Sequence, residues 1–437
     1  MKNSISSIFE NSHYDYKEII ISKNIETELM TIAKCQNCEN HTNFSLNIDE
    51  KNKTSQKNAN IKLKKFKNIE EQIDLKKINN DFGRCVCGMR HLDIAMAHVL
   101  KIMIEKNIPL RKHTLRDGPI PLLTLFTSNP NKHDYVGKDS LVILHPQLKT
   151  KIANIIVKEV DEVKGVLKGY PNDTVGIKDT DSEAITYELL AGSDIRCDIV
   201  KIPRNNFIEN TNNKIIENTN NKIIKNTNNK LIENTSKTSL KKETIETNEE
   251  KIAINKIQHL TYLEFAPSIE NKVKKLDDYL KSENIMDEKL SKLSVLDGTC
   301  GNGTLGIFLL KKGVKNVIFN DIWKPATFMT SVNLEANGFK TEILIDFNNI
   351  FDINKNNKNN ADNENNNKNN EDNENNNIIA SGNNFKVYNL AIENLKDKLS
   401  IKNENKFDIC VLDCFPGENT DNFEKIANSL ANNVLII

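Results

Sequence analysis

The sequence of 437 residues lacks any run of about 18 apolar residues, the length that a membrane-spanning helix needs. Its first residues, MKNSISSIFENSHYDYKEII, lack the apolar core and cleavage-like site of a secretion signal. The chain also lacks an excess of either charge, because 60 Lys and Arg residues balance 60 Asp and Glu residues. A uniformly basic nucleic-acid coat and an acidic tail protein are therefore disfavoured, although a local basic face is compatible with this balance. We expect a soluble, cytoplasmic protein without a membrane partner.

Eight cysteines are too few for a disulfide scaffold in a chain of this length. Four of them form two close pairs, Cys35 with Cys38 and Cys85 with Cys87. Thiolates in two such pairs suit a tetrahedral zinc ion or an iron–sulfur centre. The alternatives are reduced thiols without a metal and a redox role for the Cys35–Cys38 pair.

Three tracts are rich in asparagine and low in complexity: residues 39–80, 205–250 and 353–384. The second holds an eight-residue repeat, IENTNNKI, at Ile208 and again at Ile216. Eight residues do not match the helical period, and the units are too short for a solenoid. We expect flexible insertions, with a binding array as the alternative.

The remaining sequence divides into two blocks joined by the repeat tract. Residues 1–204 form an N-terminal α+β block that contains the first tract, and residues 251–437 form a second block that contains the third. In the first block, residues 92–104 have the apolar spacing of a core helix, and residues 141–144 and 189–200 are typical of buried strands.

The first block also holds a local cationic group, which could bind a phosphate or a carboxylate or could simply be a solvated face. Its members are Arg90, His91, Arg111, Lys112, His113 and Arg116.

The most informative segment lies in the second block and reads KLSVLDGTCGNGTLGIFLLKKGVKNVIFND. Residues 294–297 are predicted to form a short buried strand, residues 304–312 a helix, and residues 314–320 a second strand. Asp321 lies at the tip of that second strand, where an acid can hold two ribose hydroxyls. This succession predicts the first unit of a doubly wound, Rossmann-like α/β sheet.

Between the first strand and the helix, Gly301, Gly303 and Gly306 have the spacing G-x-G-x-x-G. Glycine has no Cβ atom, so the main chain can turn sharply and lie close to a ligand. The following helix offers unpaired N–H groups at its N-terminus to an anion.

Asp297 ends the first strand, and three residues separate it from Gly301, which gives the pattern D-x-x-x-G-x-G. This pattern resembles motif I of the class I S-adenosylmethionine-dependent methyltransferases, and the resemblance runs from about Tyr262 onward. It implies S-adenosylmethionine as the cofactor, with Gly301 and Gly303 along its methionine part, Asp297 near its amino group and Asp321 on its ribose. A nicotinamide or flavin binder and a Rossmann-like domain that binds neither are the alternatives.

Residues 407–413 (FDICVLD) predict a strand that matches the fourth strand of this family, whose tip faces the transferred methyl group. Asp413 at that tip is the candidate catalytic residue, as a general base or a substrate contact; equally, it could cap the strand and the next helix. Cys414-Phe415-Pro416 follows, whereas the amino-methylating branch has an acid or Asn before Pro-Pro-aromatic. Methylation of an exocyclic amine is therefore not supported.

Two segments fit the third strand, residues 341–346 (TEILID) and residues 385–390 (FKVYNL). Asp346 would contact adenine under the first alternative, and Asn389 would replace it under the second. Residues 434–437 fit a fifth strand, after which the family normally adds two more. We expect a sheet truncated after strand five, which the N-terminal block or a partner completes or which stays open.

The combination of CVCGMRHLD in the first block with VLDGTCGNGTLG in the second resembles a narrower family, the archaeal HmdC or HcgG type. Those proteins are assigned to biosynthesis of the iron-guanylylpyridinol cofactor of Fe-hydrogenase. The resemblance implies methyl transfer to a small cofactor precursor or a protein partner. One alternative is a non-catalytic metal carrier with a vestigial nucleotide-binding fold. Another is an RNA methyltransferase, although 6% aromatic residues and zero net charge disfavour a nucleic-acid partner.

Overall fold

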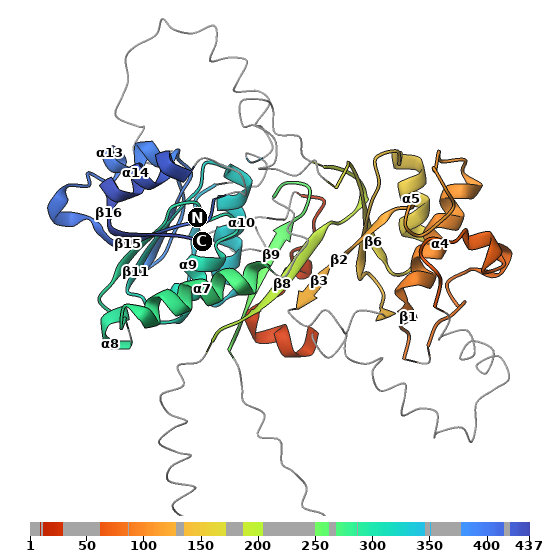
Figure 1. The fold of residues 1–437 in the computed structure, drawn as a ribbon, viewed down its shortest axis with the longest axis horizontal. Helices are drawn as coiled ribbons and strands as arrows, with labels where there is room; N and C mark the ends of the chain where they lie inside the picture. Colours follow the sequence, from red (N-terminus) through yellow and green to blue (C-terminus); the bar gives the residue numbers. More distant parts are fainter. Residues whose placement is uncertain are drawn as a thin grey trace, which may run out of the picture. The chain divides into compact units, whose positions relative to one another are not determined.

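The computed structural model describes the chain with several gaps (Figure 1). The described residues are 9, 12–28, 62–85, 87–127, 135–171, 187–203, 250–261, 268–285, 287–345, 350, 377–414 and 420–437. Residues 1–200 and 252–437 belong to one compact unit, and residues 201–251 form another. In the second unit the Ile202 N–H donates a hydrogen bond of 2.9 Å to the Glu250 carbonyl.

The C-terminal block is built on a seven-stranded sheet. In chain order its strands are β10 (Ser294–Asp297), β11 (Asn316–Asn320), β12 (Glu342–Ile343), β13 (Ile378–Ser381), β14 (Phe385–Tyr388), β15 (Phe407–Leu412) and β16 (Ala431–Ile436). In space the order is β12-β13-β14-β11-β10-β15-β16. From β14 to β16 all neighbours are parallel, whereas β12 and β13 are antiparallel. The parallel part therefore has the chain order 3-2-1-4-5, which confirms the predicted doubly wound arrangement.

Helices cover both faces of this sheet (Figure 1). They are α7 (Ser268–Ser282), α8 (Asp287–Leu290), α9 (Thr304–Lys311), α10 (Lys324–Ala336), α13 (Leu395–Lys398) and α14 (Thr420–Leu430), with short 3-10 turns η7 (Ile392–Asn394) and η8 (Asn403–Asn405). Helices α7, α9 and α10 lie on one face, and α13 and α14 lie on the other. This two-sided cover explains why β10 and β15 are buried at nearly every position rather than at alternate positions.

The two candidates for the third strand have different places in the sheet. Phe385–Tyr388 is β14 and pairs in parallel with β11, so it takes the third position. In the other candidate, Glu342–Ile343 forms the edge strand β12 and pairs antiparallel with β13. Asp346 itself lies outside the described residues. The topology thus favours the alternative in which Asn389 follows the third strand.

The N-terminal block is α+β, as predicted. Its helices are α4 (Leu92–Glu105) and α5 (Thr150–Glu159), and 3-10 turns occur at η1 (Tyr16–Glu18), η2 (Ser22–Asn24), η4 (Ile69–Glu71) and η5 (Leu75–Lys77). Its strands are β1 (Arg90–His91), β2 (Ile120–Leu123), β3 (Leu125–Thr127), β4 (Tyr135–Val136), β5 (Leu141–Leu144), β6 (Val163–Lys168), β7 (Glu188–Gly192) and β8 (Ile195–Lys201). Strand β9 (Lys251–Ile257), from the start of the second block, joins them beside β8. They form the sheets β2-β5-β6-β7, β3-β8-β9 and β1-β4.

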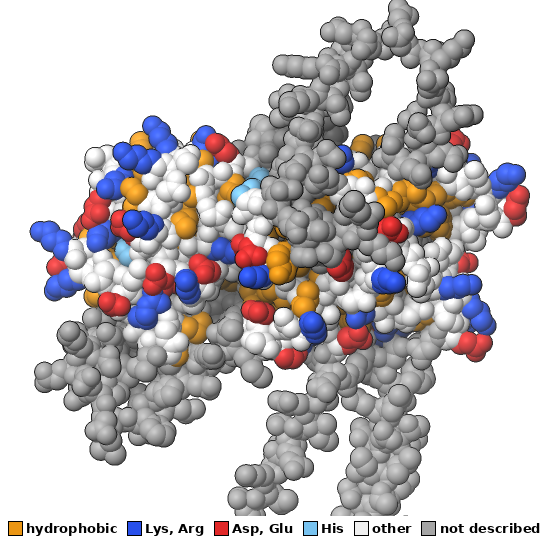
Figure 2. Space-filling model, turned by 180° about the vertical axis from the view of Figure 1, so that it is seen from behind, with side chains coloured by type: hydrophobic (Ala, Val, Ile, Leu, Met, Phe, Trp, Pro, Cys, Tyr) orange, Lys and Arg blue, Asp and Glu red, His pale blue; other side chains and the backbone are white. Residues whose placement is uncertain are grey.

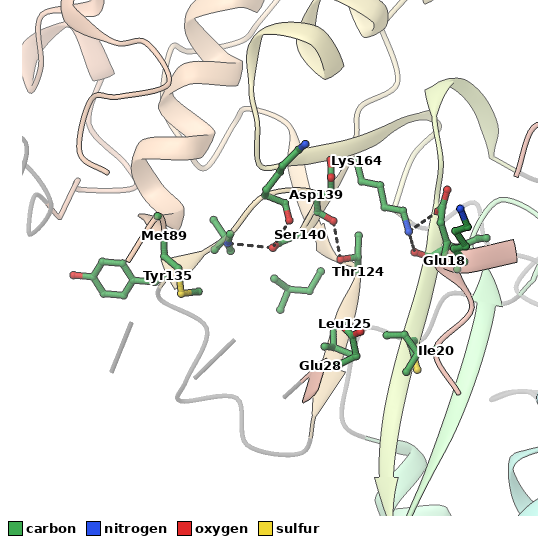
Figure 3. A pocket seen from close by; sticks show the side chains of 18 of the residues that line it. Glu18, Ile20, Glu28, Met89, Thr124, Leu125, Tyr135, Asp139, Ser140 and Lys164 are labelled. Atoms are coloured by element: carbon green, nitrogen blue, oxygen red, sulfur yellow. Dashed lines mark hydrogen bonds and ion pairs between the residues drawn. The ribbon is translucent and has the colours of Figure 1, made fainter. Parts of the chain in front are cut away.

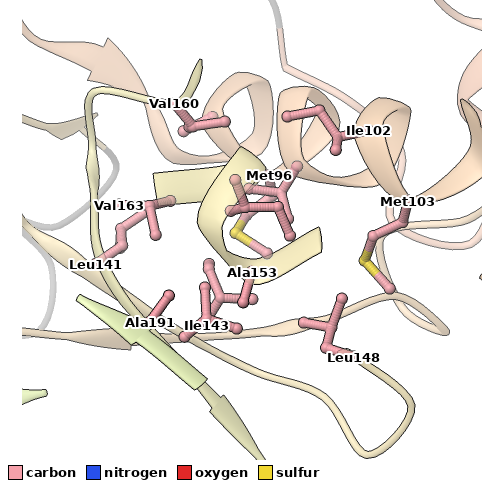
Figure 4. Packing of buried hydrophobic residues seen from close by; sticks show 14 of the residues in the cluster. Met96, Ile102, Met103, Leu141, Ile143, Leu148, Ala153, Val160, Val163 and Ala191 are labelled. Carbon is pink, nitrogen blue, oxygen red and sulfur yellow. The ribbon is translucent and has the colours of Figure 1, made fainter. Parts of the chain in front are cut away.

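The predicted core helix is α4, and it packs with α5 against the sheet of β5 and β6 (Figure 4). The cluster includes Met96, Ile102, Met103, Leu141, Ile143, Leu148, Ala153, Val160, Val163 and Ala191. All of these side chains are buried. Burial of each large aliphatic side chain contributes about 1.5–3 kcal/mol, so this cluster is the main stabilising feature of the block.

Residues 189–200 were expected to form one strand and instead form parts of two. Gly192 has a φ of +72°, and a Cβ atom there would lie 2.1 Å from the Lys164 carbonyl oxygen. The chain can therefore leave β7 only at a glycine, and β8 then joins a different sheet. Cys197 in β8 is a buried core residue, as predicted.

Two asparagines of α10 bind the main chain of β9. Asn333 accepts from the Asn255 N–H (2.7 Å) and donates to the Asn255 carbonyl (2.9 Å). Asn337 repeats the pattern at Ala253, with distances of 3.0 and 2.7 Å. Because residues four apart share one helix face, the two amides act as a substitute for a neighbouring strand. They connect the β3-β8-β9 sheet to the helix layer of the larger sheet.

The expectation of flexible insertions is wrong at the ends of two tracts. In the first tract, residues 62–80 are described, and Ile69 and Ile78 are fully buried. In the third tract, Ile378–Ser381 is strand β13. In both places isoleucines bury enough apolar surface to offset the entropy cost of ordering the chain. The high asparagine content of the tracts made these short apolar segments hard to recognise in the sequence. The repeat at residues 205–249 lies outside the described residues.

The cationic group of the first block is divided by the fold. Arg90 is fully buried and pairs with the equally buried Glu162, which also receives Arg84 at 2.7 Å. His91 is buried as well and caps α4 by accepting from the Asp93 N–H. A buried charge is tolerated only when it is paired, so Arg90 is a structural residue. Arg90 and His91 therefore leave the cationic group, and its remaining members Arg111, Lys112, His113 and Arg116 lie after α4.

Lys and Arg side chains are interspersed with Asp and Glu on the face shown in Figure 2, in line with the balanced charge of the chain. Of the helices that the structure describes, none is long and apolar enough to cross a membrane.

Candidate functional site

The predicted glycine loop connects β10 to α9 and lies at the carboxyl end of the parallel strands. Gly301 and Gly303 both have left-handed backbone angles, with φ values of +53° and +84°. Gly303 is the N-cap of α9, so the N–H groups of the first helical turn follow directly after the loop. The strand, loop and helix occur where the sequence predicts them.

The three glycines serve different purposes. A Cβ atom on Gly306 would lie 2.1 Å from the Phe319 ring, so this glycine allows α9 to pack closely on β11. A Cβ atom on Gly303 would lie 2.8 Å from Thr330. A Cβ atom on Gly301 would meet no heavy atom of the described residues within 4 Å. The main chain at Gly301 therefore borders open space, as close approach by a ligand requires.

Asp297, at the end of β10, is buried and incompletely satisfied. Its Oδ2 atom accepts a hydrogen bond from the Gly306 N–H at 2.8 Å. Its Oδ1 atom has no hydrogen-bond partner among the described residues. Burial, aided by the negative charges of Asp413 and Asp321, raises the pKa of Asp297 to about 8. A buried carboxyl with an unsatisfied oxygen is suited to receive a cation.

Asp321 connects the tip of β11 to the glycine loop. Its Oδ2 atom accepts from the Gly301 N–H at 2.9 Å, and its Oδ1 atom accepts from the Trp323 N–H at 2.8 Å. A carboxylate oxygen has more than one lone pair and can accept more than one hydrogen bond. The Trp323 indole N–H donates to the Leu260 carbonyl at 2.6 Å, which fixes the start of α10.

Asn389 lies beside Asp321, after β14. Its side-chain amide donates to the carbonyls of Asp321 (2.9 Å) and Ile322 (2.8 Å). The Ile322 side chain is 68% exposed although it directly follows the acid. Ile322 was not among the predicted site residues. An apolar residue immediately after the acid at a strand tip would have indicated it. Asn389 thus joins the tips of the second and third strands.

Two polar residues of α10, which were not predicted as site residues, donate hydrogen bonds to main-chain carbonyls of the glycine loop. The Thr330 hydroxyl donates to the Gly301 carbonyl at 2.8 Å, and the Asn333 amide donates to the Asn302 carbonyl at 3.0 Å. Both side chains are fully buried. Their three-residue spacing on a buried helix face was the available signal.

Asp413 follows β15, next to β10 in the sheet. Its Oδ2 atom lies 2.8 Å from the Lys272 Nζ atom of α7, and both side chains are about one-quarter exposed, at 24% and 27%. Its N–H donates to the Thr299 hydroxyl of the glycine loop at 2.7 Å. The structure therefore brings Asp413 to the same edge as Asp297 and Asp321. A partly exposed carboxylate at this edge can contact a substrate.

The structure describes one of the two predicted cysteine pairs. Cys35 and Cys38 lie outside the described residues, whereas Cys85 and Cys87 are both partly exposed. A tight turn encloses the second pair, since the Cys85 N–H donates to the Met89 carbonyl at 2.7 Å and the Gly88 N–H to the Cys85 carbonyl at 2.9 Å. Within the described ranges no group of three or more metal-binding side chains converges.

A buried polar network not anticipated from the sequence surrounds Asp194. This fully buried carboxylate accepts from the Tyr14 hydroxyl (2.8 Å) and the His259 N–H (2.6 Å), and it lies 2.9 Å from the His259 ring nitrogen Nδ1. Burial opposes its ionisation, but the adjacent His259 and these hydrogen bonds lower the pKa of Asp194. The network fixes residue 259 next to Leu260, the acceptor of the Trp323 indole.

A cavity of about 540 Å³ lies in the N-terminal block and includes no residue of the glycine loop (Figure 3). Its lining includes Glu18, Met89, Thr124, Tyr135 and Lys164. Lys164 Nζ lies 2.6 Å from Glu18 Oε2, so two of its charged groups neutralise each other. This pairing gives no preference for a ligand of either charge.

No family model matches the sequence, and no curated protein matches it. Among solved structures, the chain is similar to TYW2 from P. horikoshii in complex with MeSAdo, with 14% identity, coverage of 76% of this chain and 75% of that one, and a TM-score of 0.30. It is also similar to Trm5b from Pyrococcus abyssi (14% identity, 66% and 54% coverage, TM-score 0.28) and to a tRNA methyltransferase from M. jannaschii (11% identity, 68% and 54% coverage, TM-score 0.28). The chain spans about half the length of the latter two. Identities and TM-scores this low say nothing about activity or substrate.

Proposed function

We propose that the C-terminal block binds S-adenosylmethionine at the glycine loop and transfers its methyl group to an acceptor. The observation that carries this proposal is the open main chain at Gly301, whose N–H donates to Asp321, while the Gly306 N–H at the start of helix α9 donates to Asp297. The ammonium group of S-adenosylmethionine needs a carboxyl that binds a cation, and its ribose hydroxyls need an acid. Its sulfonium needs a turn of main chain that no side chain covers.

The residues present fit the cofactor. The unsatisfied Oδ1 atom of Asp297 would receive the ammonium group of the methionine part. Asp321 would hold the ribose hydroxyls with its carboxylate group, which also accepts from the Gly301 and Trp323 N–H groups. Ile322 would cover the adenine ring, with Asn389 at its edge, so Asn389 rather than Asp346 is the residue that we assign there.

When bound, S-adenosylmethionine supplies a methyl group on a positively charged sulfur, which is already a strong electrophile. The protein therefore contributes mainly by positioning the acceptor against that group. Asp413 is the residue proposed to contact the acceptor and to take its proton, with Lys272 holding the carboxylate in place. An acceptor that carries a hydroxyl or thiol suits this arrangement, because no exocyclic-amine motif follows β15.

For the acceptor, we propose a small precursor of the iron-guanylylpyridinol cofactor or a protein partner. The support for this choice is the resemblance of CVCGMRHLD and VLDGTCGNGTLG to the HmdC or HcgG type. The zinc or iron site of Cys35, Cys38, Cys85 and Cys87 is a separate proposal, supported by the close spacing of each pair. Metal analysis of protein purified without oxygen tests it, and an unchanged metal content in Cys85→Ser would exclude this site.

Calorimetric titration tests the cofactor directly. S-adenosylmethionine is expected to bind, whereas NADH and FAD are not, because the loop has three residues between the strand and Gly301. Binding of NADH or FAD without binding of S-adenosylmethionine would replace the methyltransferase proposal with a dinucleotide-binding one.

A further inference from the structure

An exposed aromatic residue lies at the tip of a basic turn in the N-terminal block. The sequence Lys64-Lys65-Phe66-Lys67 forms a turn closed by a hydrogen bond of 3.1 Å from the Lys67 N–H to the Lys64 carbonyl. Phe66 is 80% exposed, more than any other large exposed apolar side chain of the described residues. A single exposed apolar residue is ordinary on a protein surface, so its surroundings decide its significance.

The turn is held firmly in one conformation. The Gln72 side chain accepts from the Lys64 N–H at 2.7 Å and donates to the Lys64 and Lys67 carbonyls at 3.1 and 2.9 Å. On either side, Leu63 and Ile69 are buried and anchor the segment. The Phe66 ring is therefore displayed by a rigid support, which lowers the entropy cost of binding something to it.

A second basic segment lies against this turn. The Arg116 N–H donates to the Lys65 carbonyl at 2.9 Å, and the Ile69 N–H donates to the His113 carbonyl at 2.8 Å. The Arg116 guanidinium carbon lies 5.9 Å from the centre of the Phe66 ring, within cation–π distance. Residues 111–116 are thus brought beside residues 62–67.

The two segments together form a basic surface, here called the Phe66 surface. Its exposed basic side chains are Lys62, Lys64, Lys65, Lys67, Arg111, Lys112 and Arg116. Among the nearby acids, Glu71 pairs with Lys67 at 3.5 Å and Glu70 contacts His113. Within the described part of the chain, the following form no ion pair: Lys64, Lys65, Arg111, Lys112 and Arg116. The seven basic side chains outnumber the neighbouring acids Glu70, Glu71 and Asp117, so the surface is positive although the whole chain is neutral.

We propose that the Phe66 surface binds single-stranded nucleic acid. The lysines and arginines would contact successive phosphates, and an unpaired base would stack on the Phe66 ring opposite Arg116. Positive grooves with exposed aromatic rings bind single strands in this way, since every base has a flat face. The charge complementarity favours a polyanion, and the rigid exposed ring favours one that carries bases. The proposal is independent of the cofactor site, because binding is measured without S-adenosylmethionine.

Fluorescence anisotropy with an oligouridylate of about 12 nucleotides tests the proposal on the full chain, between about 50 and 200 mM salt. Phe66→Ala is expected to weaken binding roughly 5- to 150-fold, the range for removal of one stacked base, without changing the salt dependence. Tyr170→Ala, at another exposed aromatic residue, is the matched control and should bind like the parent. Equal affinities for Phe66→Ala and Tyr170→Ala would overturn the proposal, as would no binding at about 50 mM salt.

The proposed contacts between lysines and phosphates are tested by a pair of double variants. Lys64→Ala with Lys65→Ala is expected to reduce the slope of log K against log salt by about 1.4, because each phosphate that a lysine neutralises on a single strand accounts for about 0.7. Lys289→Ala with Lys292→Ala changes the net charge equally at exposed positions of another segment and should leave the slope unchanged. Equal slopes for the two double variants would contradict the role of Lys64 and Lys65 in binding phosphates.

Heparin, a polyanion without bases, separates stacking from simple charge attraction. Phe66→Ala should bind heparin as the parent does, and a parallel decrease in affinity for heparin and oligouridylate would show that the ring only supports the turn. Calorimetry with S-adenosylmethionine on Phe66→Ala keeps the two sites distinct, because failure of nucleic-acid binding leaves cofactor binding intact.

Discussion

Asp321 accepts a hydrogen bond from the main-chain N–H of Gly301, with 2.9 Å between Oδ2 and the nitrogen. This contact joins the acid at the tip of β11 to the loop after β10, two features that the sequence places twenty residues apart. Side chain and loop are therefore positioned together, before any ligand is present. A change at Asp321 should affect both the ribose contact and the shape of the loop.

The first prediction concerns this residue. Asp321→Ala should lower the affinity for S-adenosylmethionine at least tenfold, because a hydrogen bond to a charged group contributes about 1.5–3 kcal/mol. Asp321→Asn should bind better than Asp321→Ala, since its oxygen can still accept from Gly301. Calorimetry measures both, with Asp278→Ala at an exposed position of α7 as the control. Parent-like affinity in Asp321→Ala would remove the ribose assignment.

The second prediction compares two glycines with similar surroundings. Gly301 and Gly313 both have positive φ, and a Cβ atom on either would meet nothing within 4 Å in the part of the chain that the structure describes. Alanine at each position should cost about 1–2 kcal/mol of stability through its left-handed backbone. Only Gly301→Ala should also lose affinity for S-adenosylmethionine, because its methyl group enters the space assigned to the ligand. Thermal unfolding and calorimetry together separate the two effects; equal affinities would place the ligand elsewhere.

The third prediction follows from the burial of Asp297, whose pKa is raised to about 8. An aspartate in an unfolded chain has a pKa of about 3.9, so the folded protein holds an extra proton between about pH 4 and pH 8. Stability should fall through this window as pH rises, by up to about 1.4 kcal/mol per pH unit. Asp297→Asn cannot ionise and should become more stable than the parent toward pH 8, with the difference shrinking toward pH 4. Parallel urea-unfolding curves across this range would contradict it.

The fourth prediction links the same carboxyl to the cofactor. An ammonium group placed against Asp297 favours the ionised carboxylate, so binding of S-adenosylmethionine near pH 6.5 should release up to about one proton. Calorimetry in buffers with different ionisation enthalpies measures this number. Asp297→Asn should show no such release from this site. Equal binding heats in all buffers for the parent would place the amino group elsewhere.

The sequence predicted the part of the fold that depends on local pattern. The strand at Ser294–Asp297, the helix that begins at Thr304 and the strand that ends at Asn320 are all present, because apolar runs and glycines determine them locally. The third strand could not be chosen, since both candidate segments are short and apolar and only pairing with β11 distinguishes them. Arg90 was wrongly assigned to the cationic group for a related reason, because its partner Glu162 is 72 residues away in the chain.

The last prediction concerns Asn333, whose contacts are equally long-range and were not foreseen. Its amide satisfies the N–H and the carbonyl of Asn255 and also reaches the Asn302 carbonyl of the glycine loop. Asn333→Ala leaves these three groups without this partner, each at about 1–3 kcal/mol, so we expect stability to fall by at least about 3 kcal/mol in urea unfolding. Asn154→Ala, at an exposed position of α5, is the control and should change stability by less than about 1 kcal/mol. A similarly small change in Asn333→Ala would mean that β9 does not depend on α10, and the connection between the two sheets would have to lie in the apolar contacts alone.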